Sequence, residues 1–260
     1  MQRFYGDEPH IVEKRRVRAA KKPTAAPSRR KIGLKLAVTA AVLSVFALFY
    51  VAFNSARTET VMRVKRKEWY YVGIFTSADS GQATIKALDI RTRGGAGFIY
   101  NDGNFSVVAS VYPTEREAKS VEGKQPDPAT VIKTEFSEIR FPAAETDETI
   151  SSALALPAAA IAELNDMAQS YEKGNLTESE VAYRLDGIRA KANEFLCAVE
   201  GQTSAAATYS AKVLAAIIEA IGKADDDEAA VLSSRLRYCA CEIVDGVAEL
   251  SAVYAGMQLS

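Results

Sequence analysis

The sequence predicts an α+β domain followed by an all-α domain, both behind a single membrane helix. Three patterns predict this fold class: an uncharged apolar run at 36–53, alternating strand-like and helix-like segments at 68–137, and amphipathic helical stripes at 146–258. We expect the transmembrane helix first, then a βαββαβ domain with a four-stranded antiparallel sheet, and last an antiparallel four-helix bundle.

Charge is unevenly distributed along the chain. The 260 residues include 32 Lys and Arg against 33 Asp and Glu, yet residues 1–55 contain 11 basic and 3 acidic side chains. Residues 144–260 contain 8 basic and 19 acidic side chains. The near-neutral total therefore says little about partners, and each segment is interpreted by itself.

The apolar run predicts a membrane-spanning helix over residues 32–53. Its core, LAVTAAVLSVFALFYVAF, has 18 uncharged residues, and a helix needs about 20 apolar residues to cross the hydrocarbon layer. Tyr50 and Phe53 near one end fit the aromatic belt of a membrane interface. A cleaved signal peptide is the alternative, but the preceding segment is too long and no A-x-A cleavage site follows.

The segment before this run, residues 1–31, is a basic tail rich in Lys, Arg, Ala and Pro. Its composition predicts disorder and attraction to anionic lipid headgroups. More basic residues precede the span than follow it, which predicts a cytoplasmic N-terminus, a linker at 54–67 and extracytoplasmic domains in the cell membrane. Nucleic-acid binding is the alternative role, but a charge run beside a membrane span usually sets topology, so we expect no nucleic-acid partner.

Residues 68–137 have the signals of a small sheet domain. Aromatic and β-branched residues predict strands, and the Asp102-Gly103 pair predicts a hairpin turn. The predicted elements are a strand at 69–75, a helix at 82–91, strands at 96–100 and 105–112, a helix at 115–121 and a strand at 130–136. This order is the split βαβ pattern, which forms one antiparallel sheet with both helices on the same face.

Two segments of this domain resemble a known family. The first strand contains YVGIFTS at 71–77, and the third strand and its following helix contain FSVVASVYPTEREA at 105–118. Both are similar to the half-motifs of the SPOR domain, a bacterial peptidoglycan-binding module. The resemblance covers about 70 residues and departs from the family pattern at Tyr71, Ile74 and Ser110. It implies binding of peptidoglycan glycan strands and localisation to division or sporulation septa.

The resemblance places the glycan on the open face of the sheet, and strand parity suggests which side chains lie there. The serines of the third strand mark one alternating set as the open side, and Tyr71 offers a ring for sugar stacking. The expected glycan-binding residues are Tyr71, Ile74, Ser106, Val108, Ser110 and Tyr112. The alternative is that the aromatic side chains pack beneath a loop or against the next domain.

After a linker at 138–145, residues 146–258 predict four helices with apolar stripes at helical spacing. Thr177 and Glu180 form a capping box for the second helix, and Pro157 lies on the stripe of the first, where we expect a kink. Glycine-containing breaks separate the helices. Short connections between helices of this length predict an up-down antiparallel bundle whose stripes form its core.

Residues suited to catalysis are scarce. His10, the only histidine, lies in the basic tail, so the outer domains lack an imidazole for a nucleophilic pair or a zinc site. The three cysteines, Cys197, Cys239 and Cys241, leave open one bond between Cys197 and either of the others. The acidic run at 225–228 lacks the alternating ligands of a calcium loop. We expect no catalytic residues, metal or cofactor, and therefore not an enzyme.

Two functions remain on the sequence alone. The resemblance favours a membrane-anchored, extracytoplasmic peptidoglycan-binding protein of SPOR-domain type. The alternative is a non-catalytic protein–protein interaction scaffold at the cell envelope, with a degenerate SPOR-like domain and the helical bundle binding envelope proteins.

Overall fold

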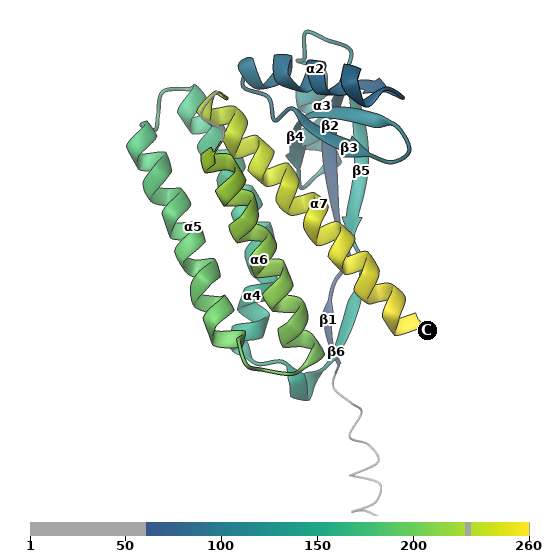
Figure 1. The fold of residues 1–260 in the computed structure, drawn as a ribbon, viewed down its shortest axis with the longest axis vertical. Coiled ribbons are helices and arrows are strands. Elements are labelled where there is room, and N and C mark those ends of the chain that lie inside the picture. Colours follow the sequence, from purple (N-terminus) through teal and green to yellow (C-terminus); the bar gives the residue numbers. More distant parts are fainter. Residues whose placement is uncertain (1–60, 227–229, 260) are drawn as a thin grey trace, which may run out of the picture. The chain divides into compact units, whose positions relative to one another are not determined.

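The structure, a computed structural model, describes residues 61–226 and 230–259 (Figure 1). The predicted basic tail at 1–31 and transmembrane helix at 32–53 lie outside the described residues. Within them, the chain combines helices with two small antiparallel sheets, so the expected mixture of α and β structure is confirmed.

The larger sheet has four strands in the order β3-β4-β2-β5, with every neighbouring pair antiparallel. Its elements follow one another along the chain as β2 (Lys67–Ser77), α2 (Ser80–Thr92), β3 (Phe98–Asn101), β4 (Phe105–Tyr112), α3 (Glu115–Glu122) and β5 (Thr130–Phe136). This is the βαββαβ order that the turn and strand signals predict.

Local sequence signals fix the ends of these elements. The carboxylate of Asp79 caps α2 by accepting from the backbone N–H of Gly81 at 2.7 Å, and the Thr114 hydroxyl caps α3 in the same way. Gly97 has φ +55° before β3, and a Cβ there would lie 2.3 Å from the Ala87 carbonyl oxygen. Only glycine lets the chain pass this close to α2.

The smaller sheet pairs β1 (Val61–Val64) with β6 (Ile139–Pro142) in antiparallel register, from Val61 opposite Pro142 to Val64 opposite Ile139. Both strands fall in stretches that the sequence analysis treats as linkers, 54–67 and 138–145. Ile139 and Phe141 are buried, so these residues pack into the fold instead of separating two domains. A short 3₁₀ helix, η1 (Ala143–Glu145), follows β6.

Four long helices complete the described chain. They are α4 (Glu148–Glu172), α5 (Glu178–Val199), α6 (Ala205–Asp226) and α7 (Leu232–Leu259), and α4 contacts each of the other three. The capping box of Thr177 and Glu180 starts α5 as predicted. The first of these helices is capped by Asp147, whose carboxylate accepts from the backbone N–H of Ile150 at 2.8 Å.

Two hydrophobic cores enclose the larger sheet. One lies between the sheet and the pair α2 and α3; the other is continuous from the opposite face of the sheet into the interior of the four long helices. The described residues accordingly form one compact unit. In Figure 1, α7 (yellow) passes along the side of the sheet opposite to α2.

Among the described residues, one helical segment, Ala205–Lys223 in α6, is long and apolar enough to cross a membrane. Half of it is buried within the fold, against α4, α5 and α7. A core helix of a water-soluble fold has the same length and composition, so this segment is weak evidence of a membrane span.

Candidate functional site

The six side chains expected to bind glycan do not share one face of the sheet. Tyr71 and Val108 belong to the core shared with the long helices, whereas Ile74 belongs to the core beneath α2 and α3. Ser106 lies opposite Tyr100, on the side of the long helices, and Ser110 lies opposite Val72, on the other side. Tyr112 also packs on the side of α2 and α3.

Two register shifts in the pairing of β2 with β4 cause this division. Val72 lies opposite Ser110 but Gly73 lies opposite Val108, so Ala109 is an extra residue in β4. The second shift adds an extra residue to β2. Gly73 lies opposite Val108 and Phe75 lies opposite Val107, so Ile74 has no partner residue in β4. A bulge shifts the alternation of side chains by one residue, so strict parity assigns the residues beyond it to the wrong face.

Five of these six residues are also inaccessible. The exposed fraction is 0% for Tyr71 and Val108, 3% for Ser106 and Ser110, and 6% for Ile74, while Tyr112 is half-buried. A sugar-stacking surface needs an exposed ring, and Tyr71 has none. This corrects the expectation of an open, glycan-facing side of the sheet and favours the alternative, in which the aromatic side chains pack against the helical part.

Helix α7 covers the face of the sheet on which Tyr71 lies. The Tyr71 ring lies 6.1 Å from the ring of Phe98 and 5.2 Å from that of Tyr100, and Phe98 in turn meets Tyr238 of α7 edge-on at 5.7 Å. The Tyr71 hydroxyl donates a long hydrogen bond of 3.5 Å to the carbonyl oxygen of Cys241. Burial raises the pKa of Tyr71 well above its usual value, which keeps the phenol neutral.

Hydrogen bonds fasten α7 to the sheets near its C-terminus. The backbone N–H of Ser137 donates to the Ser251 hydroxyl at 2.8 Å. The Gln258 amide donates to the Arg140 carbonyl oxygen at 2.6 Å and accepts from the Arg140 N–H at 3.1 Å, so it pairs with β6 as a neighbouring strand would. These contacts give hydrogen-bond partners to backbone groups of Ser137 and Arg140.

Near its N-terminus α7 is fastened by Arg237. One guanidinium nitrogen, Nη1, donates to the Gly94 carbonyl oxygen in the turn after α2 and to the Glu172 carboxylate at the end of α4. The other, Nη2, donates to the second oxygen of the same carboxylate at 2.6 Å. Asn165 of α4 adds a 2.8 Å hydrogen bond to the Val111 carbonyl oxygen of β4. Polar anchors therefore hold the helical part against the sheet at both ends of α7.

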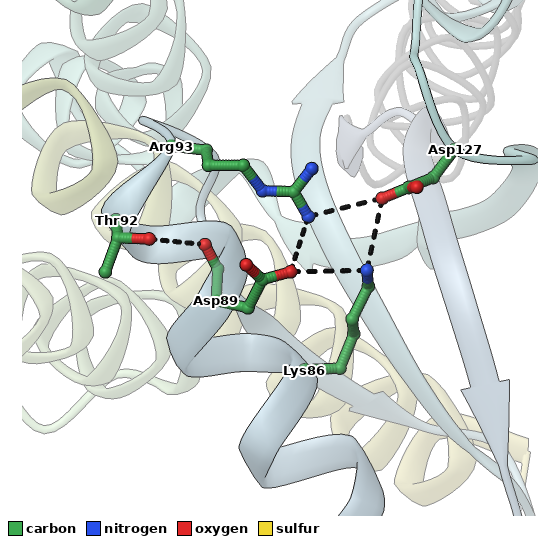
Figure 2. Close-up of polar contacts among 5 residues, drawn as sticks. All are labelled: Lys86, Asp89, Thr92, Arg93 and Asp127. Atoms are coloured by element: carbon green, nitrogen blue, oxygen red, sulfur yellow. Dashed lines mark hydrogen bonds and ion pairs between the residues drawn. The ribbon is translucent and has the colours of Figure 1, made fainter.

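A charge cluster lies on the opposite side of the sheet, on α2 (Figure 2). Lys86 contacts Asp89 at 3.3 Å and Asp127 at 3.1 Å, and Arg93 contacts the same two carboxylates at 2.6 and 3.2 Å. Hydrogen bonds from Lys86, and then from Arg93, lower the pKa of both Asp89 and Asp127. Two cations and two anions neutralise one another, so the cluster joins α2 to the loop before β5 rather than presenting a charged ligand site.

The described surface includes a groove between α4 and α5 and another beside β3. One, of about 640 Å³, lies between α4 and α5, with Tyr183 (80% exposed) at its rim and Arg184, Asp186 and Lys191 among its lining residues. The other, of about 340 Å³, is lined by α2, β3 and α7. Neither groove is predicted from the sequence, because each depends on how separate elements pack against one another.

Side chains with metal-binding or nucleophilic chemistry do not gather in the described part of the chain. No group of three or more His, Cys, Asp or Glu residues there is placed to hold a metal ion. Cys197 is exposed, Cys239 and Cys241 are buried, and all three are free thiols, so the bond left open by the sequence does not form.

Comparison of the chain with known protein families, with curated proteins and with solved structures finds no significant match.

Proposed function

We propose that this protein is a membrane-anchored, non-catalytic interaction scaffold of the cell envelope, in which a SPOR-like sheet serves as a structural element. The observation that supports this choice over wall binding is the burial of Tyr71 and its neighbours under α7. A partner protein can use the outer surfaces of such a fold, whereas a glycan strand would need the face that α7 covers.

Displacing α7 to admit a glycan would be costly. Fully burying a large apolar side chain stabilises a fold by about 1.5–3 kcal/mol, and Tyr71, Phe98 and Tyr238 are packed together at this contact. The hydrogen bonds of Arg237 and Gln258 would be broken as well. The closed arrangement therefore favours the scaffold over a sheet that opens to bind sugar.

The short expected distance between the membrane and the folded unit also favours the scaffold over wall binding. The predicted span ends at residue 53 and β1 begins at Val61, so residues 54–60 reach at most about 25 Å. A unit held this close to the bilayer is suited to meeting other membrane-bound proteins. A wall-binding module would be better served by a long tether.

The groove between α4 and α5 is the surface we assign to a protein partner. Tyrosine and arginine are residue types that dominate protein interfaces, and both the exposed Tyr183 and the half-buried Arg184 line this groove. Arg184 is held there by ion pairs with Glu163 and Asp166. Its floor includes small residues, Ala159, Ala160 and Gly187, which permit close approach of a partner backbone.

The test combines in-cell photo-crosslinking with sedimentation on purified peptidoglycan. A photoreactive amino acid at position 183 is expected to give discrete protein adducts, and the same residue at Ala182, exposed but outside the groove, is expected to give few. The full chain in detergent should not sediment with peptidoglycan, whether or not its glycans have been stripped by an amidase. Selective retention on stripped glycans would instead support wall binding and contradict the scaffold.

A further inference from the structure

The strand β3 forms one edge of the larger sheet, since the strand order places only β4 beside it. In an antiparallel pair, alternate residues direct their backbone N–H and C=O groups away from the partner strand. An edge strand therefore presents donors and acceptors to which another extended chain can hydrogen-bond.

The groove of about 340 Å³ lies at the first half of this edge, at Phe98 and Ile99. It is lined by Leu88 and Arg91 of α2, by Phe98 and Ile99 of β3, and by Glu242 and Asp245 of α7, among others. Because α2 and α7 lie on opposite faces of the sheet, they form the two walls and β3 forms the floor. The two walls meet at one end, where Arg91 packs on the Tyr238 ring. Leu88 is 57% exposed, so one wall offers an apolar contact.

The other wall has an uncompensated negative charge. Lys223 binds Glu242, and the Arg91 guanidinium lies 4.6 Å from the centre of the Tyr238 ring. Asp245 has neither an ion pair nor a hydrogen-bond partner within the part of the chain that the structure describes. Partial burial, together with Glu242 and Glu249, raises the pKa of Asp245, so a cation beside this carboxylate would relieve both desolvation and repulsion.

We propose that an extended segment of a partner protein, with a basic side chain, adds to β3 as a short fifth strand in this groove. Its backbone pairs with the edge of β3, an apolar side chain packs on Leu88, and the basic side chain binds Asp245. A second copy of this chain fits less well, since β3 (Phe98–Asn101) contains no basic residue to place beside Asp245. The inference rests on the proposed scaffold function and specifies a partner class and a second surface.

The direct test uses fluorescent octapeptides and the full chain in detergent micelles. A peptide of alternating valine and lysine is expected to bind, and one of alternating valine and glutamate is expected to bind at least about 10-fold more weakly. N-methylation of alternate amides in the lysine peptide removes strand pairing while preserving charge, and should also weaken binding about 10-fold. Equal binding of the three peptides, or no binding of the lysine peptide at about 1 mM, would overturn the proposal.

Matched substitutions locate the site. Asp245→Asn should weaken binding of the lysine peptide by about 5- to 10-fold, whereas Glu249→Gln, on the same helix but outside the groove lining, should change it little. Leu88→Lys should weaken binding, while Ile85→Lys, which alters an even more exposed side chain of α2 (72%) outside the groove, should not. Unchanged affinity in both Asp245→Asn and Leu88→Lys would refute the assignment, provided that far-UV circular dichroism shows both variants folded.

Failure of this proposal and failure of the scaffold function are distinguishable. The crosslinks expected at position 183 report on the groove between α4 and α5, which shares no lining residue with the groove at β3. Loss of peptide binding with retained crosslinks refutes only the added strand.

Discussion

Tyr71 lies at the centre of the contact between the sheet and α7. Its ring packs between aromatic residues of β3, and its hydroxyl makes only one long hydrogen bond, to a backbone carbonyl of α7. Its contribution at this position is therefore the burial of a large ring, with a small contribution from the hydroxyl.

Substitutions at Tyr71 separate these contributions. Tyr71→Ala should lower the free energy of unfolding by about 3–5 kcal/mol, because it leaves a cavity in a fully buried core. Tyr71→Phe should lower it by less than about 1 kcal/mol, since it removes one weak hydrogen bond. Urea denaturation of the full chain measures both. A negligible effect of Tyr71→Ala would indicate an exposed ring and hence the open face that the sequence suggests.

At the scale of elements, α2 is attached to the rest of the sheet domain by apolar packing and by the four-residue charge cluster. Asp89 and Asp127 have lowered pKa values in the fold because Lys86 and Arg93 stabilise their ionised forms. A carboxylate with a lowered pKa stabilises the folded state above its unfolded-state pKa, and this stabilisation is lost as pH falls through the lowered value.

We therefore expect acid to weaken the attachment of α2. Stabilisation by the cluster should be complete at neutral pH and should decline below about pH 4, the region of the ordinary aspartate pKa. Asp127→Asn should lower the Tm at neutral pH and flatten its dependence on pH in this region. Because these groups are exposed, high salt should reduce the difference between the variant and the unchanged protein. A variant whose pH profile parallels that of the unchanged protein would show that the cluster contributes nothing.

The elements also show what a sequence can and cannot predict. Turn and capping signals are local, so the Asp102-Gly103 hairpin and the Thr177–Glu180 capping box identify elements where the structure has them. The bulge at Ala109 does not show in the alternation of polar and apolar residues along the sequence, because valine, alanine and serine fit either side of a strand. Its effect is large, since it moves Ser110 to the face opposite Val108.

The sequence also gives no indication of pairings between short strands that lie far apart in the chain. The strands β1 and β6 have four residues each and lie far apart in the chain, and neither has enough residues to show an alternation. The cover of α7 over the sheet could not be predicted either. An amphipathic stripe shows that a helix face is buried, but it does not say against which element.

At the scale of the molecule, one core extends from the sheet into the long helices. Trp69, the only tryptophan, is fully buried in β2 and packs 5.7 Å from Phe136 of β5, so its fluorescence reports on the sheet. Far-UV circular dichroism reports mainly on the helices. Because the two parts share a core, we expect them to unfold together.

The two signals should therefore give coincident transitions in urea. Tyr71→Ala should shift both midpoints equally, since the residue belongs to the shared core. Two separate transitions, or a shift of the fluorescence midpoint alone, would show that the sheet and the helices are independent domains joined by a linker.

The short ladder of β1 and β6 also has a mechanical consequence. In the proposed topology, any tension between the membrane and a bound partner enters the fold through Val61, the first residue of β1. A force along the axis of β1 acts in shear on the hydrogen bonds between β1 and β6. These hydrogen bonds therefore share the force instead of breaking one after another. The β1–β6 pair can thus resist this force and transmit it to α7 through the two hydrogen bonds between Arg140 and Gln258.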